Sequence, residues 1–247
     1  MHPDKPSEFV VNGFVPTVTF ATHGDGMQST ACVYNYFSDL YPDCRSGATV
    51  NAWAFSSSGE CLGHVSQHVP YRGQARIASS RFGQDFFGSL AVSLIPDDPP
   101  EKRPRGVGTG YYVQYQDSAG RMDHSHEWDP MRFTPTTSVP WLCVVRPHAG
   151  STQLVVLNSY FGADSAAGLA RFCVRLRDRS GIVLDEQQGI TIPSRGAWSM
   201  DVTELFPRVA EFVSHRPLAI DVMGQNMMGP FTLVRSPGGD FNVHHFC

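Results

Sequence analysis

Two stretches of the chain resemble each other and are followed by further matches in the same order, which strongly limits the folds it can adopt. Residues 29–37 read STACVYNYF, and residues 151–161 read STQLVVLNSYF. A Ser-Gly pair then follows in each half, at 58–59 and at 180–181. Since self-similarity identifies the repeating unit before any local structure is assigned, the sequence predicts two copies of one fold.

Two further pairs of segments keep the same order. They are VPYRG at 69–73 with IPSRG at 192–196, and YVQY at 112–115 with FTLV at 231–234, the latter pair extending through Gly120 and His126 to match Gly239 and His245. We therefore predict a tandem duplication of a small domain, with a first copy at 1–133 and a second copy at 134–247. These ranges are called the first half and the second half below.

Composition narrows the function classes. Hydrophobic residues make up 41% of the chain and charged residues 17%, which is typical of a folded protein rather than a disordered one. The net charge of -4 gives no reason to expect a nucleic-acid partner. No stretch approaches the roughly 20 apolar residues of a membrane span, so we expect no membrane partner.

The six cysteines form no CxxC pair, and three of them, Cys32, Cys143 and Cys173, lie inside apolar runs. Free cysteine in such runs behaves as a small hydrophobic residue. The sequence therefore predicts a reduced, cytoplasmic protein. The alternative is a secreted protein in which six cysteines form three bridges.

The hydrophobic pattern predicts strands almost throughout. Residues 50–55 and 172–177 alternate with a period of two, as half-buried strands do, and each run ends in a Ser-Gly turn. The apolar runs 31–34 and 154–157 are short enough for central strands. A short helix is expected only after Asp201, which can cap it, and Pro207 ends it. We predict an all-β protein with a β-sandwich in each copy.

The order of these elements carries a family resemblance. An apolar strand ends in an asparagine, at Asn35 and Asn158, and a Pro-x-Arg turn follows at 70–72 and 193–195. A strand of aromatic and β-branched residues then closes each copy. Each half resembles the sensory rhodopsin transducer family, whose small β-sandwich is fibronectin-III-like. The resemblance implies a soluble homo-oligomer that binds a partner or small ligand without an established reaction.

Histidines cluster at the two repeat ends. Residues i and i+2 of a strand point to one face, so His124 and His126 can aim at one metal ion. The repeat sets His126 against His245. The predicted ligand set is His23, His124, His126, His244 and His245, suited to a divalent metal such as zinc or iron. In a metal-dependent enzyme, Glu127 or Asp123 would carry the proton. The alternative is that these histidines are solvated strand ends.

Aromatic residues gather around the boundary between the copies. We expect Tyr112, Tyr115, Trp128 and Trp141 to line a ligand site there, because clefts between domains often bind ligands. The leading hypothesis is non-catalytic recognition of a small molecule or protein partner at this junction. The metal-dependent enzyme is the first alternative, and a structural or assembly module is the second.

One strand of the second half is rich in arginine. Alternation places Arg171, Arg175, Arg177 and Arg179 on one face, and the corresponding strand of the first half carries Trp53 and Phe55 there. One hypothesis is that the two faces meet and the guanidinium groups stack on the rings. The alternatives are a solvated sheet face and an anion-binding surface.

Overall fold

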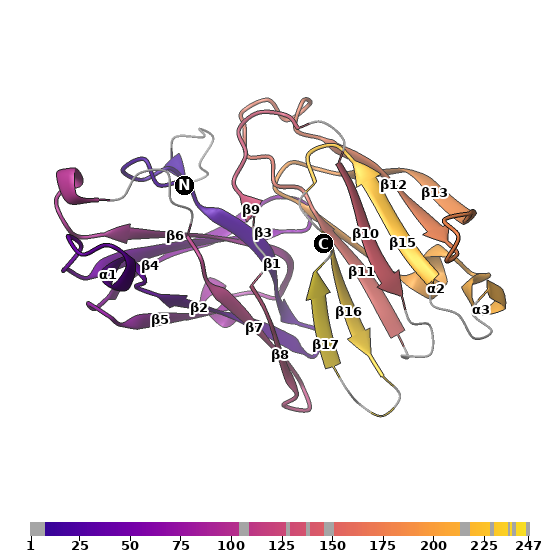
Figure 1. Ribbon diagram of the computed structural model, residues 1–247, viewed down its shortest axis with the longest axis horizontal. Helices are drawn as coiled ribbons and strands as arrows, with labels where there is room; N and C mark the ends of the chain where they lie inside the picture. The colour runs from indigo at the N-terminus through magenta and orange to yellow at the C-terminus, as the bar shows by residue number, and fades with distance from the viewer. Residues whose placement is uncertain are drawn as a thin grey trace.

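The computed structural model describes residues 8–103, 109–126, 129–136, 139–145, 151–212, 218–227, 230–236, 238 and 241–245, with the backbone alone at 139–145 and 245. Strands dominate these residues, which confirms the predicted all-β class (Figure 1). Among the helices in this part of the chain, none is long and apolar enough to cross a membrane.

The first half contains nine strands and three short helical turns within the described residues. The strands are β1 (Thr17–Gly24), β2 (Met27–Tyr34), β3 (Ala48–Ser56), β4 (Cys61–Val69), β5 (Gln74–Ala78), β6 (Phe86–Pro96), β7 (Tyr112–Asp117), β8 (Met122–Ser125) and β9 (Asp129–Pro130). The helical turns are α1 (Phe37–Leu40), η2 (Ser79–Phe82) and η3 (Pro100–Lys102).

These strands form two layers that one hairpin connects. Strands β4-β3-β6-β1 make sheet A1, and strands β5-β2-β7-β8 make sheet B1. Strand β1 turns into β2 through Asp25 and Gly26, whose φ angles of 47° and 73° suit the mirror-image turns that hairpins favour. The pairing of Gly24 with Met27 and of His23 with Gln28 joins the two layers into one sheet.

The second half contains eight further strands and two short helices within the described residues. The strands are β10 (Val139–Val145), β11 (Ser151–Leu157), β12 (Ala170–Arg177), β13 (Val183–Ile192), β14 (Ala197–Asp201), β15 (Leu218–Gly224), β16 (Phe231–Arg235) and β17 (Phe241–His245). The helices are α2 (Val202–Leu205) and α3 (Val209–Phe212). The Asp201 carboxylate accepts a hydrogen bond from Thr203 N at 2.8 Å, so the predicted cap begins α2.

The two halves share one strand order. Strands β10-β15-β12-β13 form sheet A2, which corresponds strand by strand to β1-β6-β3-β4, and β14-β11-β16-β17 form sheet B2, which corresponds to β5-β2-β7-β8. Equivalent positions can therefore be read from the pairing register. Descent from a duplicated domain and the boundary after residue 133 stay predictions.

Sheet B2 is buried on both of its faces. Leu154 and Val156 point inward and pack with Val174 of sheet A2. The alternate residues Val155 and Leu157 belong instead to the hydrophobic core of the first half. Figure 1 shows β11, β16 and β17 between the first half and the strands of sheet A2. Alternation along the strands, with both sets apolar, is what allows this sheet to sit between two layers.

Aromatic rings fill the contact between the halves. The Phe20 ring of β1 lies 6.0 Å from the Phe231 ring of β16, and the Phe55 ring lies 5.1 Å from the Phe161 ring, centroid to centroid. Phe9 packs edge-on against both Phe55 and Phe161. Rings in such tilted and edge-to-face arrangements add to the burial of their apolar area. The outer face of sheet A1 is thus covered by sheet B2 and by these flanking rings.

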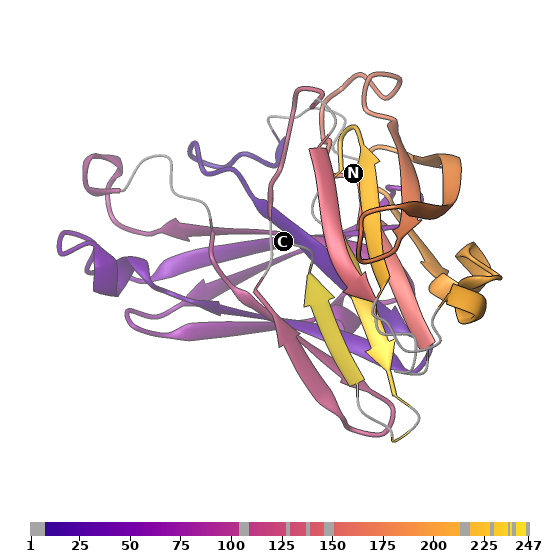
Figure 2. The same cartoon turned by 45° about the vertical axis from the view of Figure 1, so that its right-hand side comes forward.

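Two turns and two strands complete this contact. Ala197 N donates a hydrogen bond to the Ser57 carbonyl oxygen at 3.0 Å, which brings the β13–β14 turn against the β3–β4 turn. Strand β17 lies beside β8 in both views (Figure 2). Val243 N donates to the Asp123 carboxylate at 2.6 Å, so the last strand of the second half is tied to strand β8 of the first.

Candidate functional site

The outer face of sheet B1 is open to solvent and carries two exposed tyrosines. Strand β2 alternates between buried and less buried positions, which turns Cys32 and Tyr34 outward. Strand β7 alternates in the same way and turns Tyr112 outward. Cys32 lies directly opposite Tyr112 in the register, so these side chains share one face of the sheet.

A groove of about 330 Å³ opens on this face, and we call it the tyrosine groove. Its lining residues are Cys32, Tyr34, Tyr36, Gly110, Tyr111, Tyr112 and His126. Four of the seven are tyrosines, so the walls are mainly aromatic carbon with few polar groups. Small-molecule sites in proteins commonly combine such apolar walls with a few placed polar atoms.

Two of the groove tyrosines have their hydroxyl groups fixed. Tyr34 donates to the Asp39 carboxylate at 2.6 Å, and this hydrogen bond raises the pKa of Tyr34. Tyr111 donates to the Thr17 carbonyl oxygen at 3.2 Å, and burial raises its pKa. Burial also raises the pKa of Tyr36 and of the Cys32 thiol. These three phenols and the thiol are therefore neutral at physiological pH.

Tyr112 is the most accessible ring of the groove. It is 58% exposed. The rings of His124 and His126 approach it edge-on, with centroids at 6.2 and 6.3 Å. His126 lies among the lining residues, and both imidazoles are exposed. The predicted ligand residue Tyr112 and the predicted metal ligands His124 and His126 are thus neighbours on one rim.

The other predicted aromatic residues lie elsewhere. Tyr115 is fully buried, and its hydroxyl donates to the Phe20 carbonyl oxygen at 2.8 Å, inside the first half. Trp128 lies outside the described residues, and so does the side chain of Trp141 on β10. The groove is lined by residues of the first half alone, whereas the described residues between the halves form the apolar contact already given.

The remaining histidines are dispersed or only partly described. His23 lies 3.8 Å from Asp85, at the β1–β2 hairpin end. Asp123, predicted as a proton carrier, accepts from Val243 N and lies 3.9 Å from His124. His244 is exposed on β17. Glu127 and the His245 side chain lie outside the described residues. Among the described residues, no three His, Cys, Asp or Glu side chains form a group that would hold a metal ion.

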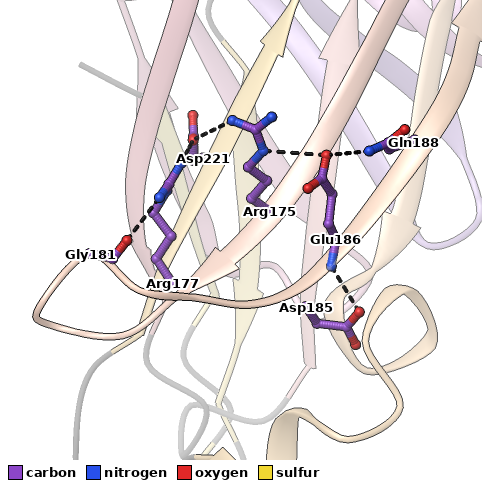
Figure 3. Close-up of polar contacts among 7 residues, drawn as sticks. All are labelled: Arg175, Arg177, Gly181, Asp185, Glu186, Gln188 and Asp221. Carbon is purple, nitrogen blue, oxygen red and sulfur yellow. Dashed lines mark hydrogen bonds and ion pairs between the residues drawn. The ribbon is translucent and has the colours of Figure 1, made fainter.

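The arginine strand forms a second polar surface, which we call the arginine face. Arg177 donates to the Asp221 carboxylate from Nε at 3.1 Å and from Nη2 at 2.8 Å. Arg175 forms an ion pair with Glu186 at 3.4 Å, and Gln188 donates to the same carboxylate at 2.8 Å (Figure 3). These charges are paired within sheet A2 rather than with another layer.

The hypothesis that these arginines stack on Trp53 and Phe55 is wrong, and the alternative of a sheet face open to solvent fits the arginines better. Trp53 stacks on His64, with centroids 4.7 Å apart, and meets Phe9 edge-on. Phe55 packs on Phe9 and Phe161. The two faces occupy equivalent positions in the two halves, and the face that covers Trp53 and Phe55 comes from other segments. The anion-binding alternative for the arginine face stays a prediction.

Sequence reasoning missed Tyr34, Tyr36 and Cys32 as site residues. Their signal was present, since Tyr34 and Cys32 alternate with the buried Ala31 and Val33. It also missed Asp221, an acidic residue in the middle of an apolar strand. A charge at such a position indicates a buried partner, because unpaired buried carboxylates are costly.

Comparison with known proteins adds little. No family model matches the chain, and no significant match was found among curated proteins. Among solved structures, the chain is similar to the exo-β-D-glucosaminidase CsxA, studied with a glucosamine-configured castanospermine and an amino-australine analogue as inhibitors. The identity is 11%, the match covers 81% of this chain and 24% of that chain, and the TM-score is 0.18. The resemblance to the sensory rhodopsin transducer family stays a prediction.

Proposed function

We propose that the first half recognises a small molecule with a flat, apolar face, which binds in the tyrosine groove. The observation that carries this proposal is a groove of about 330 Å³ with four tyrosines among its lining residues. This volume is near the lower end of ligand sites, so it suits a ligand of one or two rings. The site is on sheet B1 rather than at the junction that the sequence predicts.

The chemistry of the walls sets the preferences of the site. Tyr112 offers an exposed ring face for stacking, and aromatic pairs contribute about 0.5–1.5 kcal/mol beyond the area they bury. His126 at the rim can donate or accept one hydrogen bond, which would orient a polar substituent. His126 is the one described lining residue that could act as a general base, and no carboxylate among the described lining residues stands beside it to orient it, so recognition suits the groove better than reaction.

A titration with simple aromatic probes tests this proposal. Indole and p-cresol would be added to labelled protein, and amide chemical shifts would be followed by NMR. We expect saturable shifts for residues of β2 and β7. The Tyr112→Ala variant should weaken probe binding about tenfold, which corresponds to the upper part of the stacking range.

Tyr71→Ala is the matched control. Tyr71 is also exposed, at 43%, but lies outside the groove, where the Arg72 guanidinium sits 5.4 Å from its ring centroid. This variant should bind the probes as the natural chain does. Equal weakening by both variants, or shifts that centre away from β2 and β7, would contradict the proposal.

The metal-dependent reaction remains a prediction. His124 and His126 lie on the groove rim, but Glu127 and the His245 side chain are outside the description.

A further inference from the structure

The contact between the two halves is heterologous, because it joins two different surfaces. The outer face of sheet A1 meets the outer face of sheet B2, and the β3–β4 turn meets the β13–β14 turn. Gly59 and Gly196 lie at the two turns. A side chain on Gly59 would collide with the Ser194 carbonyl oxygen, and one on Gly196 would lie 2.5 Å from the Ser57 carbonyl oxygen. The contact is therefore close, and its two sides are different surfaces.

Both sides of this contact recur at the free ends of the molecule. Because the strand order is shared, the outer face of sheet A2 is equivalent to the covered face of sheet A1, and sheet B1 is equivalent to sheet B2. The β12–β13 turn repeats the β3–β4 turn, with φ of 84° at Gly181 against 83° at Gly59. A side chain at Gly181 would meet no described atom within 4 Å.

The β13–β14 turn, on the other side of the contact, also has an equivalent, which is the β4–β5 turn. Arg72 in the β4–β5 turn has a φ of 53°, and Arg195 in the β13–β14 turn has a φ of 65°. Both are left-handed positions that an arginine rarely adopts. Gly73 follows the first and Gly196 follows the second, each with its N–H donating to a proline carbonyl oxygen three residues earlier. The backbone shapes that make the internal contact are thus present on both free surfaces.

We propose that a second copy of this chain docks head to tail, with the outer face of its sheet A2 on the outer face of sheet B1. The internal contact between sheets A1 and B2 supplies the geometry. This proposal does not rest on ligand binding in the tyrosine groove.

The free faces offer suitable chemistry for such a contact. Sheet A2 presents Arg171 and Arg175, and sheet B1 presents Tyr34 and Tyr112. Arginine and tyrosine are both enriched at protein interfaces, and a guanidinium stacks on a phenol ring. These faces are more polar than the internal ones, because Arg175 occupies the position of Trp53. Association is therefore expected to be weaker than the internal contact and dependent on concentration.

A head-to-tail contact predicts a specific behaviour. Because the two surfaces differ, each bound copy leaves one surface of each kind free, and the assembly grows into open chains or closed rings. Sedimentation velocity from about 1 µM to about 1 mM would show species larger than dimers if the contact forms.

Two variants each block docking at one of the two surfaces. Gln114→Lys adds a charge to sheet B1 at the position equivalent to the buried Leu233, outside the groove lining. Ala219→Lys adds a charge to sheet A2 beside Arg177. Each variant alone should sediment as a monomer. An equimolar mixture keeps one intact pair of surfaces, so it should form dimers and nothing larger.

Ser165→Lys is the charge-matched control. It places the same charge on an exposed turn between β11 and β12, outside the strands of both faces, and it should associate as the natural chain does. A natural chain that stays monomeric at every concentration would overturn the proposal, and the polar faces would then be caps that end a two-unit array. Association that survives in either variant alone would also overturn it. A docked copy would cover the Tyr34 and Tyr112 rings that also line the groove. Probe binding is therefore measured in the Ala219→Lys variant, which keeps sheet B1 intact and should stay monomeric, so the two proposals fail independently.

Discussion

The outer faces of sheets A1 and A2 occupy equivalent places in the two halves but have opposite surroundings. In sheet A1, Trp53 pairs with His64 on β4 and with Ala91 on β6. In sheet A2, Arg175 pairs with Glu186 and Asp221 at the same register. Trp53 and Ala91 are buried, with the Phe9 ring against Trp53 and the exposed His64 beside it, whereas Arg175 pairs with opposite charges at an open surface.

The difference shows what decides how tightly each face can be covered. The strand order and the inward-facing apolar residues are shared, so they fix the sandwich in both halves. The outward residues then determine whether another layer can cover the sheet. Apolar side chains gain from losing water, whereas paired charges must be desolvated before a layer can be added.

The largest expected difference in stability between the two faces comes from truncating the equivalent residues Phe55 and Arg177. Phe55→Ala removes a fully buried ring between the halves and should lower the free energy of unfolding by about 3–5 kcal/mol. Arg177→Ala removes two hydrogen bonds to the buried Asp221 carboxylate and one to the Gly181 carbonyl oxygen. Because Arg175 stays 4.0 Å from Asp221, the loss should be about 1.5–3 kcal/mol. Chemical denaturation of both variants measures the difference. Equal losses would show that the two faces are not distinguished by coverage.

The two equivalent glycines provide a second, smaller test. Gly59 and Gly181 have nearly the same positive φ, so replacement by alanine costs about 1–2 kcal/mol of backbone strain at either position. Only at Gly59 does the new methyl group meet a backbone oxygen of the other half. We expect Gly59→Ala to cost about 3 kcal/mol in total, since the turns must also separate. Thermal unfolding of both variants measures the difference. Equal melting temperatures for Gly59→Ala and Gly181→Ala would contradict the close contact.

The smallest expected effect is a difference in how stability depends on pH, which a pH series would measure. Burial lowers the pKa of His64 from 6.5, whereas its equivalent in the second half is Glu186. Below about pH 6.5 the unfolded chain binds a proton that the folded His64 resists, so the free energy of unfolding falls as pH falls. His64→Gln should lose this component and give a flatter profile. Urea denaturation between about pH 7.5 and about pH 5.5 measures it, and parallel profiles would exclude the histidine as the cause.

The strands could be predicted from sequence because their signal is local. Alternation at 172–177 and the apolar run at 154–157 correspond to β12 and β11, and the cap at Asp201 begins α2. The order of the matched segments also anticipated which strands are equivalent. Each of these inferences needs only the two-residue period of a strand or the chemistry of one turn.

The candidate site was only partly predictable. Tyr112 and His126 were singled out and lie in the groove. Tyr115 lies on the same strand but, at an odd spacing from Tyr112, it faces the other side and points into the core. The Trp53 stacking prediction failed because sequence does not show which layer covers a face. Phe9 and Phe161 come from segments without strand periodicity and supply that cover. Such non-local contacts leave no periodic trace in the sequence.

The double burial of sheet B2 also bears on how the chain is made. A ribosome delivers the first half before β11, β16 and β17 exist, and domains fold as they emerge. Phe20 and Phe55 are therefore synthesised long before Phe231 and Leu157 can shield them. Throughout that interval the nascent first half carries an uncovered aromatic surface, which is the period when it would most depend on chaperone protection.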